Sequence, residues 1–270
     1  MERFEENSYS GAKLNFYRNL PKSAPKAIVH ISHGMAEHAG RYEWFMQTLM
    51  EAGYAVYAHD IRGHGYTYAS DSFKGHFSDK HGLDKLLHDL DFSIHLIKKN
   101  HPNVPIFCFG HSLGSILLLR YATSMYHRIN GIACWNSGIE TNTLAVVGKI
   151  ILSIERKFRS PRAESYFAWK LTFDAWGNKI SNKRTNFDWL SNDTFQVDKY
   201  IQDKLCGFDI SLQSWLEVAE AVFYSSRNLS MIPSNFPICL VGGEQDPCTN
   251  YGKDMRKLAA RLKRMGHVNF

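Results

Sequence analysis

The fold is decided by residues 105–120, which read PIFCFGHSLGSILLLR. Residues 106–109 form a short apolar run of β-prone residues, and residues 113–121 are rich in helix formers. A strand must therefore meet a helix across the five residues GHSLG. Glycines at both ends of such a bend allow its two arms to pass closely and leave the Ser112 hydroxyl exposed at the carboxyl end of a sheet. The pattern predicts a nucleophilic serine.

An ordinary strand-to-helix turn is the alternative interpretation. Glycine and serine are common residues, so this spacing also arises by chance. The context favours the nucleophile, because a helix that begins at Leu113 presents its N–H groups and positive dipole end beside the hydroxyl. Those groups suit a developing oxyanion.

The composition is that of an ordinary globular protein. With 270 residues, 44% of them hydrophobic, the chain can form one large α/β domain or two small ones. The formal net charge is +6, but lysine and arginine are scattered, so we predict no nucleic-acid partner. The first residues are acidic and no long apolar run occurs, which predicts a soluble, cytoplasmic protein.

Cysteines and histidines give no metal or disulfide signature. The five cysteines have wide, irregular spacings without a C-x-x-C pair, so we expect reduced thiols, with Cys108, Cys134 and Cys239 in core strands. The thirteen histidines include no H-E-x-x-H pattern, which favours locally hydrogen-bonded side chains over metal ligands. We predict no metal.

Strands and helices alternate along most of the chain. Residues 2–20 suggest an N-terminal hairpin. The predicted strands are 26–32, 55–59, 106–109, 131–135 and 237–241, and the predicted helices are 42–51, 83–99, 113–125, 211–224 and one that ends near Arg264. This order implies an α/β fold with a mostly parallel sheet, helices on both faces, and a binding site at the carboxyl ends of the strands.

An insertion interrupts this pattern, because about 100 residues separate the last two strands, far more than one connecting helix needs. We predict a core made of residues 1–138 and 208–270, with a helical insertion at 139–207. The insertion contains an apolar helix face and several aromatic residues. Two interpretations overlap: a lid over Ser112, or a segment that only packs on the core. The apolar face consists of Val147, Ile150, Ile151, Ile154 and Phe158.

Two loops at the same edge of the sheet are candidates to complete a site. After strand 26–32, Gly34 permits a turn that points the Met35 N–H inward, beside the N–H of Leu113. After strand 237–241, Asp246 is placed to orient a histidine, and Glu244 is the weaker candidate. For both loops, a plain turn is the alternative.

Two further predictions concern the loop at residues 60–65 and the base histidine. The segment DIRGHG at 60–65 is expected to shape the site, with no proton transfer by Asp60 or His64. The base histidine should follow a further helix and strand, and no residue of this sequence occupies that place. His267 is too close to Asp246 and would lie at the wrong end of the sheet. We therefore expect weak turnover from these residues.

Four motifs together resemble a known family. They are GHSLG at 110–114, HGMAEHAGRY at 33–42, DIRGHG at 60–65 and GGEQDP at 242–247. In this order they are similar to the α/β-hydrolases of the monoacylglycerol lipase and lysophospholipase type, also grouped as serine aminopeptidase S33-like. The resemblance extends from about Ala12 to Met265, and it stops before the last strand and catalytic histidine of the family.

The resemblance implies a mechanism and a site. Ser112 would be the nucleophile, the N–H groups of Met35 and Leu113 the oxyanion hole, and Asp246 the acid, under a helical lid and without a cofactor. The substrate would be a small-molecule acyl ester such as a monoacylglycerol or lysophospholipid, cleaved through an acyl-enzyme. A catalytically inactive protein that binds an acyl ligand or a partner, and an S33-type aminopeptidase, remain alternatives.

Two kinds of association are also expected. A protein that takes lipid-like substrates is expected to make transient contact with a membrane or lipid surface. Strand 237–241 would lie at the edge of the sheet, where its unpaired backbone groups invite pairing with another chain. A homo-oligomer through this edge is the corresponding prediction.

Overall fold

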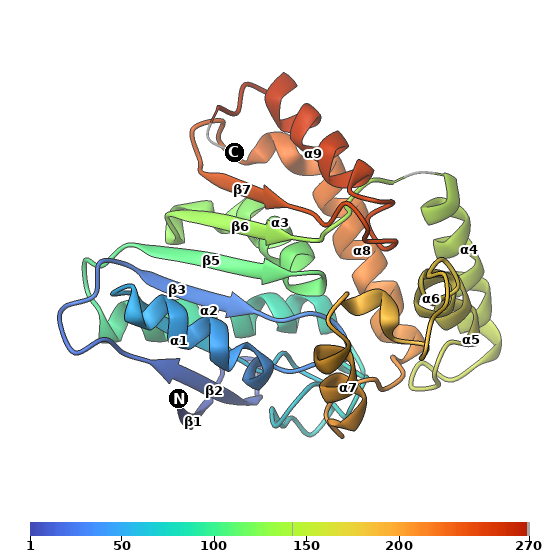
Figure 1. Ribbon diagram of the computed structural model, residues 1–270, viewed down its shortest axis with the longest axis horizontal. Helices are drawn as coiled ribbons and strands as arrows, with labels where there is room; N and C mark the ends of the chain where they lie inside the picture. Colours follow the sequence, from blue (N-terminus) through green and yellow to red (C-terminus); the bar gives the residue numbers. More distant parts are fainter. Residues whose placement is uncertain (142, 269–270) are drawn as a thin grey trace.

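The computed structural model describes residues 1–141 and 143–268, which form a seven-stranded sheet covered by helices (Figure 1). The strand order is β1-β2-β4-β3-β5-β6-β7, with β1 and β2 antiparallel to their neighbours and β4, β3, β5, β6 and β7 parallel. The strands are β1 (Glu2–Asn7), β2 (Lys13–Asn19), β3 (Ile28–Ser32), β4 (Ala55–His59), β5 (Ile106–His111), β6 (Gly131–Trp135) and β7 (Ile238–Val241). The predicted hairpin and the mostly parallel sheet are both confirmed.

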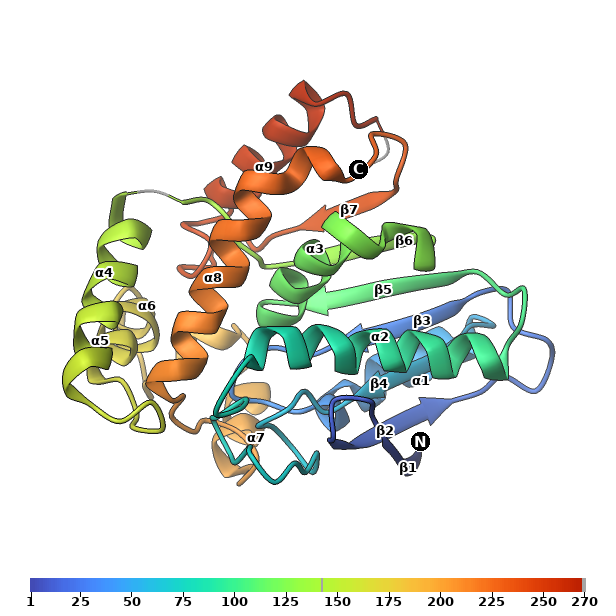
Figure 2. The same cartoon turned by 180° about the vertical axis from the view of Figure 1, so that it is seen from behind.

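Helices lie on both faces of the sheet. One face carries α1 (Glu43–Glu51) (Figure 1). The opposite face carries α2 (Gly82–Asn100), α3 (Leu113–Met125), α8 (Leu212–Asn228) and α9 (Lys253–Arg264), whose Leu258 and Leu262 join the same core cluster as Leu118 of α3 (Figure 2). The largest core cluster lies between the sheet and its covering helices, and includes Ile28, Tyr57, Ile94, Ile106, Leu118 and Ile132.

The end of β5 differs from its predicted boundary in a way that matters for the site. We expected the strand to stop at Phe109, but it continues to His111, because Gly110 and His111 pair with Cys134 and Trp135 of β6. The turn is therefore confined to a single residue, Ser112, before α3 begins.

The segment predicted as an insertion is mostly helical and lies beyond the carboxyl ends of the strands (Figure 1). It contains α4 (Thr143–Phe158), α5 (Tyr166–Trp169), a π-helical turn (Lys170–Asp174), α6 (Ala175–Gly177), a 3₁₀ turn (Asp188–Leu190) and α7 (Thr194–Gln202). None of the helices in residues 1–141 and 143–268 is both long and apolar enough to cross a membrane.

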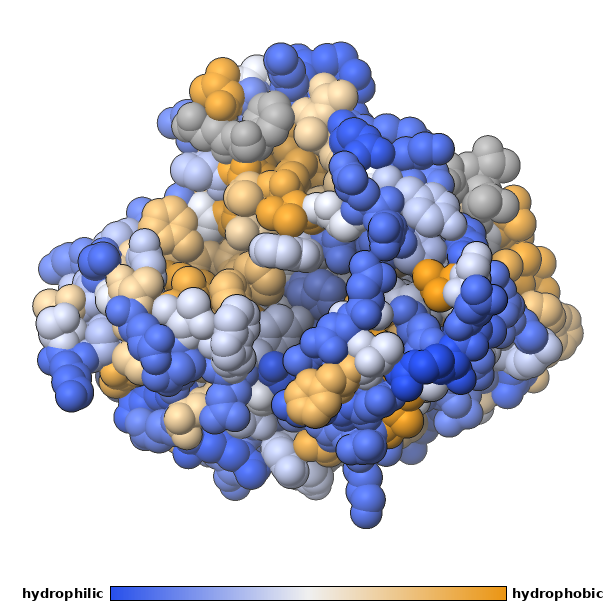
Figure 3. All heavy atoms as spheres, in the orientation of Figure 1, coloured by the Kyte–Doolittle hydropathy of each residue, from blue (hydrophilic) through white to orange (hydrophobic). Residues whose placement is uncertain are grey.

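The apolar face predicted for α4 exists, but most of it does not pack on the core. Ile150, Ile154 and Phe158 are 53%, 50% and 83% exposed, and apolar surface is visible along α4 (Figure 3). The helix instead buries Leu152 and Glu155. The carboxylate of Glu155 accepts a hydrogen bond from the Ser165 hydroxyl, and Leu152 packs with Ala168 and Leu212, so the inward side of α4 combines a polar and an apolar contact.

Candidate active site

Ser112 lies on the sharp turn between β5 and α3. Its φ of +49° and ψ of −112° are rare for a residue with a side chain, and its N–H donates to the Trp135 carbonyl at 2.9 Å. A Cβ on Gly110 would lie 2.6 Å from the backbone of Gly114, and a Cβ on Gly114 would lie 2.0 Å from the Ser32 carbonyl oxygen. Both glycines are therefore required for the close approach of β3, β5 and α3.

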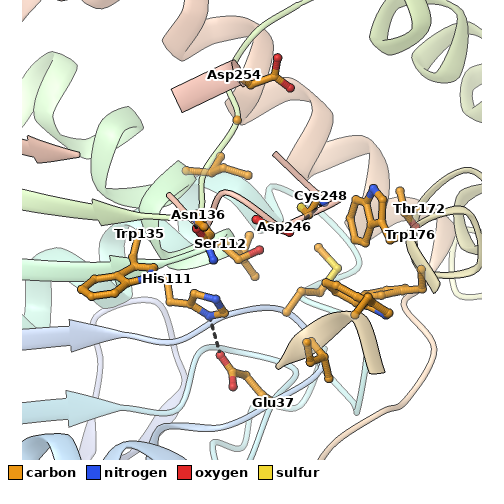
Figure 4. Close-up of a pocket in the computed structure, with 18 of the residues that line it drawn as sticks. Glu37, His111, Ser112, Trp135, Asn136, Thr172, Trp176, Asp246, Cys248 and Asp254 are labelled. Carbon is orange, nitrogen blue, oxygen red and sulfur yellow. Dashed lines mark hydrogen bonds and ion pairs between the residues drawn. The ribbon is translucent and has the colours of Figure 1, made fainter. Parts of the chain in front are cut away.

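A cavity of about 1460 Å³ opens beside this turn, between the core and the insertion. Ser112, Leu113, Met35 and Asp246 all line it, so the structure brings the four predicted site residues to one place. Figure 4 shows two of them, Ser112 and Asp246, beside this cavity. They come from three different loops at the carboxyl ends of β3, β5 and β7, the edge at which the sequence predicted a site.

Asp246 is held in place by hydrogen bonds within its own loop. Its Oδ1 accepts from the Cys248 N–H at 2.8 Å, and its Oδ2 accepts from the Thr249 hydroxyl at 2.9 Å. The Asn136 side chain, which follows β6, accepts a hydrogen bond from the Gly243 N–H at 2.9 Å and ties the loop to the sheet. The carboxylate thus lies in the cavity wall with a fixed orientation.

Two buried, neutral histidines fix the turn that carries Met35. The Nε2 of His33 accepts a backbone N–H at 2.8 Å, so its Nδ1 carries the proton and donates to the Gly34 carbonyl at 2.7 Å. The Nε2 of His64 accepts the Ala36 N–H at 3.1 Å. Burial lowers the pKa of His33 to about 4 and that of His64 to about 3, which keeps both rings neutral.

A buried carboxylate, Glu37, organises the other side of the same turn. Its Oε1 accepts from the Gly34 N–H at 2.6 Å and the Tyr42 hydroxyl at 2.8 Å, and lies 3.1 Å from Nδ1 of His111 (Figure 4). Its Oε2 pairs with Arg41. Burial by itself raises the pKa of Glu37, but the hydrogen bond with His111 and the nearby positive charges bring it well below its usual range.

The comparisons with known proteins agree with this geometry. A family model described as "Serine aminopeptidase, S33" matches residues 23–268. The chain belongs to this family. Monoglyceride lipase from Rattus norvegicus is 27% identical over 230 residues, covering 84% of this chain and 67% of the relative. Monoacylglycerol lipase from Mycolicibacterium smegmatis is 36% identical over 119 residues, covering 43% of this chain and 40% of the relative.

Solved structures show that the S33-family chain has the α/β-hydrolase fold. A thermostable carboxyl esterase from Bacillus coagulans matches with a TM-score of 0.88 and 23% identity, over 98% of this chain and 87% of that one. A variant of monoglyceride lipase from Saccharomyces cerevisiae matches with a TM-score of 0.67 and 21% identity, over 94% and 82%. The matches to the first curated relatives span from 31% to 67% of their lengths.

Histidines other than His111 do not line the cavity of this S33-family chain, as far as the described residues go. His111 is turned toward Glu37, and the Ser112 hydroxyl has no hydrogen-bond partner among residues 1–141 and 143–268. His267 follows α9 and lies near the backbone of Ile232 and Phe236, at the beginning of β7. It is therefore at the opposite end of the sheet from Asp246, as predicted.

The DIRGHG loop at residues 60–65 is buried beside the cavity and is held by hydrogen bonds. Asp60 is fully buried and accepts hydrogen bonds from the Ala39 N–H, the Tyr66 N–H and the Asn15 side chain. Neither Asp60 nor His64 is among the described residues that line the cavity. The role of this loop in shaping the site stays a prediction, which is supported by the hydrogen bonds of His64 to the Ala36 N–H and of Asp60 to the Ala39 N–H.

Sequence motifs alone predicted no role for Glu37 or His111. Arg41, four residues after Glu37, was a usable signal, because this spacing favours an ion pair within one turn. The contact with His111 carried no local signal, since residues 37 and 111 meet only because β3 and β5 are neighbours in the sheet.

Proposed function

We propose that this chain is a serine hydrolase that cleaves carboxylic esters through an acyl-enzyme. Ser112 Oγ attacks the ester carbonyl carbon while its proton passes to a histidine oriented by Asp246. The N–H groups of Met35 and Leu113 stabilise the tetrahedral oxyanion, the alcohol leaves with the proton, and water then releases the acid. The observation that carries this proposal is the Ser112 turn, with its positive φ, in the wall of a cavity that Asp246 also lines.

The two ends of the cavity favour a lipid-like substrate such as a monoacylglycerol or lysophospholipid. Glu37, Arg41 and His111 make the wall polar near Ser112, which suits the alcohol part of an ester. The insertion contributes a mainly apolar wall that suits an acyl chain. Its apolar lining residues include Val147, Ile151, Leu152, Leu171, Phe173 and Trp176. An aminopeptidase needs a free carboxylate for the substrate amine. Glu37 is already paired with Arg41, so Glu244, which also lines the cavity, is the carboxylate on which that alternative would depend.

The described residues provide no general base to accept the proton of Ser112. Asp246 bonds to Cys248 and Thr249, and no histidine contact to it occurs in residues 1–141 and 143–268. We therefore propose that these residues hydrolyse esters weakly, because loss of one triad member costs orders of magnitude in rate. An imidazole supplied from elsewhere should restore part of the rate.

Chemical rescue tests this proposal. Hydrolysis of p-nitrophenyl butyrate is measured with and without added imidazole, for the unaltered chain, Ser112→Ala and the control Ser137→Ala. Ser137 is also a buried serine near the sheet, but within residues 1–141 and 143–268 its hydroxyl has no hydrogen-bond partner and it does not line the cavity. Imidazole should accelerate the unaltered chain and Ser137→Ala, and leave Ser112→Ala at the rate of free imidazole. Equal rates for all three proteins would refute the role of Ser112.

A second candidate is an acyl-binding protein without turnover, which the unpartnered Ser112 hydroxyl favours. Binding of a non-hydrolysable monoalkyl glycerol ether, followed by tryptophan fluorescence, measures the cavity independently of catalysis. Tight binding, combined with no labelling of Ser112 by a fluorophosphonate in the presence of imidazole, would establish the binding function. Labelling of Ser112 would favour the hydrolase.

We also propose that the outer face of α4 contacts a lipid surface. Ile150 and Ile154 line a shallow apolar groove together with Phe223 of α8, and Lys149, Lys157 and Arg227 also line it. Apolar side chains flanked by positive charge are suited to the boundary of an anionic bilayer.

A further inference from the structure

A second cluster of polar side chains lies where the end of the insertion returns to the core. His38 follows β3, and Asp203 and Cys206 follow α7. Nε2 of His38 donates to Oδ2 of Asp203 at 2.8 Å. One potential metal-binding atom from each of the three side chains lies within 4.8 Å of those of the other two. None of the three is among the described residues that line the cavity, so this cluster is separate from the site of Ser112.

The turn after α7 places Asp203 and Cys206 side by side. The Cys206 N–H donates to the Asp203 carbonyl at 2.9 Å, which folds the chain back on itself. Oδ1 of Asp203 accepts the Leu205 N–H at 2.8 Å, so the carboxylate has a fixed orientation with Oδ2 toward His38. Gly207 follows with a φ of +66°, a conformation that favours glycine. Two of the three potential ligands are therefore fixed by local structure.

Contacts with Ala36 bring His38 to this turn. The Ala36 carbonyl accepts hydrogen bonds from the Gly207 N–H and from the Tyr200 hydroxyl, both at 2.9 Å. These bonds hold the segment after β3 against the end of α7, which lies beyond the carboxyl end of that strand (Figure 1). His38 and Asp203 are 165 positions apart in the chain, so no motif indicated this cluster and the sequence predicted no metal.

The three side chains offer the atoms that Zn²⁺ prefers. Zinc in proteins is bound by thiolate sulfur, imidazole nitrogen and carboxylate oxygen, whereas Mg²⁺ and Ca²⁺ favour oxygen alone. In a tetrahedral zinc site, neighbouring ligand atoms of these kinds lie about 3.4 to 3.6 Å apart. The distance of 2.8 Å between Nε2 of His38 and Oδ2 of Asp203 therefore needs to increase by only about 0.6 Å.

Burial and hydrogen bonding also suit an ion at this position. His38 and Cys206 are each 9% exposed, whereas the Asp203 side chain is 31% exposed, so an ion can enter past the carboxylate. Nδ1 of His38 is buried without a hydrogen-bond partner in residues 1–141 and 143–268. The ring proton can therefore move from Nε2 to Nδ1 without breaking another bond, which leaves the Nε2 lone pair for a metal.

The charges of the cluster balance those of a divalent cation. A thiolate at Cys206 and the carboxylate of Asp203 together carry two negative charges. Arg41 is the neighbouring cation, and its charge is offset by its ion pair with the buried carboxylate of Glu37. A bound Zn²⁺ would therefore leave no uncompensated charge in this partly buried region.

We propose that His38, Asp203 and Cys206 form a Zn²⁺-binding site that joins the end of α7 to the segment after β3. Nε2 of His38, Oδ2 of Asp203 and Sγ of Cys206 are the ligands, and water takes the fourth position. The thiol proton leaves to solvent as the zinc–sulfur bond forms. The competing outcome is a hydrogen-bonded contact between His38 and Asp203 that binds no metal.

Cobalt substitution tests the proposal without relying on catalysis. The untagged, reduced and chelator-treated chain is titrated with Co²⁺, which binds such ligands more weakly than Zn²⁺. A thiolate ligand gives Co²⁺ a charge-transfer absorption in the near ultraviolet, and tetrahedral coordination gives intense visible bands. One equivalent of Co²⁺ should produce both absorptions, Zn²⁺ should abolish them, and Mg²⁺ should have no effect. Absence of the thiolate band at saturating Co²⁺ would overturn the proposal.

Substitution of each ligand assigns the site. Cys206→Ser should remove the charge-transfer band. His38→Gln and Asp203→Asn should each weaken Co²⁺ binding by more than the roughly 10- to 100-fold that loss of an outer-shell partner costs. Circular dichroism checks that each variant is folded, and a folded Cys206→Ser variant that keeps the band would overturn the assignment. In the unaltered chain, Zn²⁺ should slow alkylation of Cys206 by iodoacetamide about tenfold or more, as measured by mass spectrometry.

Two exposed side chains provide matched controls. Cys239→Ser and His81→Gln remove a thiol and an imidazole elsewhere on the surface, and both should leave the cobalt spectrum unchanged. Cys239 is exposed, so the prediction that all three strand cysteines lie in the core was wrong for this one. Loss of the spectrum in either control variant would place the metal elsewhere on the chain and overturn the proposal.

Discussion

The turns around Ser112 and helix α4 of the insertion both border the cavity, but they are built in opposite ways. At the turns, glycines are packed against backbone, with a Cβ on Gly114 placed 2.0 Å from Ser32, and the Glu37 carboxylate is fully bonded. On α4, a Cβ on Gly148 would meet nothing within 4 Å, and Ile150 is half exposed. Close packing and complete hydrogen bonding therefore occur where the site needs a fixed geometry.

Lowering the pH should produce the largest difference in stability between the turns around Ser112 and helix α4. Burial lowers the pKa of His30 and His64 to about 3 and that of His33 to about 4, whereas residues 139–207 contain no histidine. Because the unfolded chain binds these protons near pH 6.5, this contribution is complete above that pH and is lost as pH falls toward 4. Each histidine should cost about 1.4 kcal/mol of unfolding free energy per pH unit.

Urea unfolding at several pH values measures this dependence. His30→Gln should reduce the slope by about one proton, because it removes one buried titrating ring. The control His81→Gln, at an exposed position, should leave the slope unchanged. A stability that does not vary between pH 6.5 and 4.5 would show that the buried histidines do not control the acid response.

Glycine replacement gives the next largest contrast. Gly114→Ala forces a Cβ into the Ser32 carbonyl and should lower the unfolding free energy by about 3 kcal/mol. Gly148→Ala, on α4, should raise it by about 0.5 to 1 kcal/mol, because alanine is the better helix former and the site is open. Denaturant unfolding of both variants measures the two effects. Equal changes would contradict the contrast.

Neutralising one buried carboxylate in each region compares how much each contributes to the unfolding free energy. Glu37→Gln removes the anionic partner of Arg41 and His111, and should cost about 2 kcal/mol. The matched change on α4, Glu155→Gln, should cost about 1 kcal/mol, because its partner Arg159 is partly in solvent. Thermal unfolding of the two variants provides the ranking, and a larger loss for Glu155→Gln would reverse it.

The smallest stability effect is expected on the outer face of α4. Ile150→Ser combined with Ile154→Ser should change the unfolding free energy by no more than about 0.5 kcal/mol per residue, since both side chains are half exposed. The same variant should bind anionic phosphatidylglycerol vesicles more weakly in a sedimentation assay. Leu152→Ser, on the buried side, is the control that should lose stability. Unchanged vesicle binding would refute the proposed lipid contact.

The core strands were predictable because their signals are local. The boundaries of β4, α3 and β6 agree with the predicted ranges, since apolar runs, helix formers and turn residues change abruptly at their ends. The order of motifs along the chain also placed Ser112, Met35 and Asp246 at one edge of the sheet. Their catalytic roles stay predictions until the rescue experiment is done.

The orientation of α4 was not predictable from its pattern. Periodicity showed that residues 147, 150, 151, 154 and 158 share a face, but not whether that face meets the core or the solvent. In the structure the side with Leu152 and Glu155 is buried, against Leu212 and Ser165, and Ile150, Ile154 and Phe158 are exposed. An apolar stripe on a helix indicates that the face packs against something, but it does not show what it packs against.

The sequence by itself determined the order of strands and helices, the bend at Ser112 and the set of loops that reach the cavity. These depend on residue types close together in the chain. Only the tertiary structure decided that Glu37 meets His111, that α4 exposes Ile150, Ile154 and Phe158, and that Phe107 and Trp135 are partly exposed on one face of the sheet. Such features depend on which distant segments pack against each other, and local periodicity carries no information about that choice.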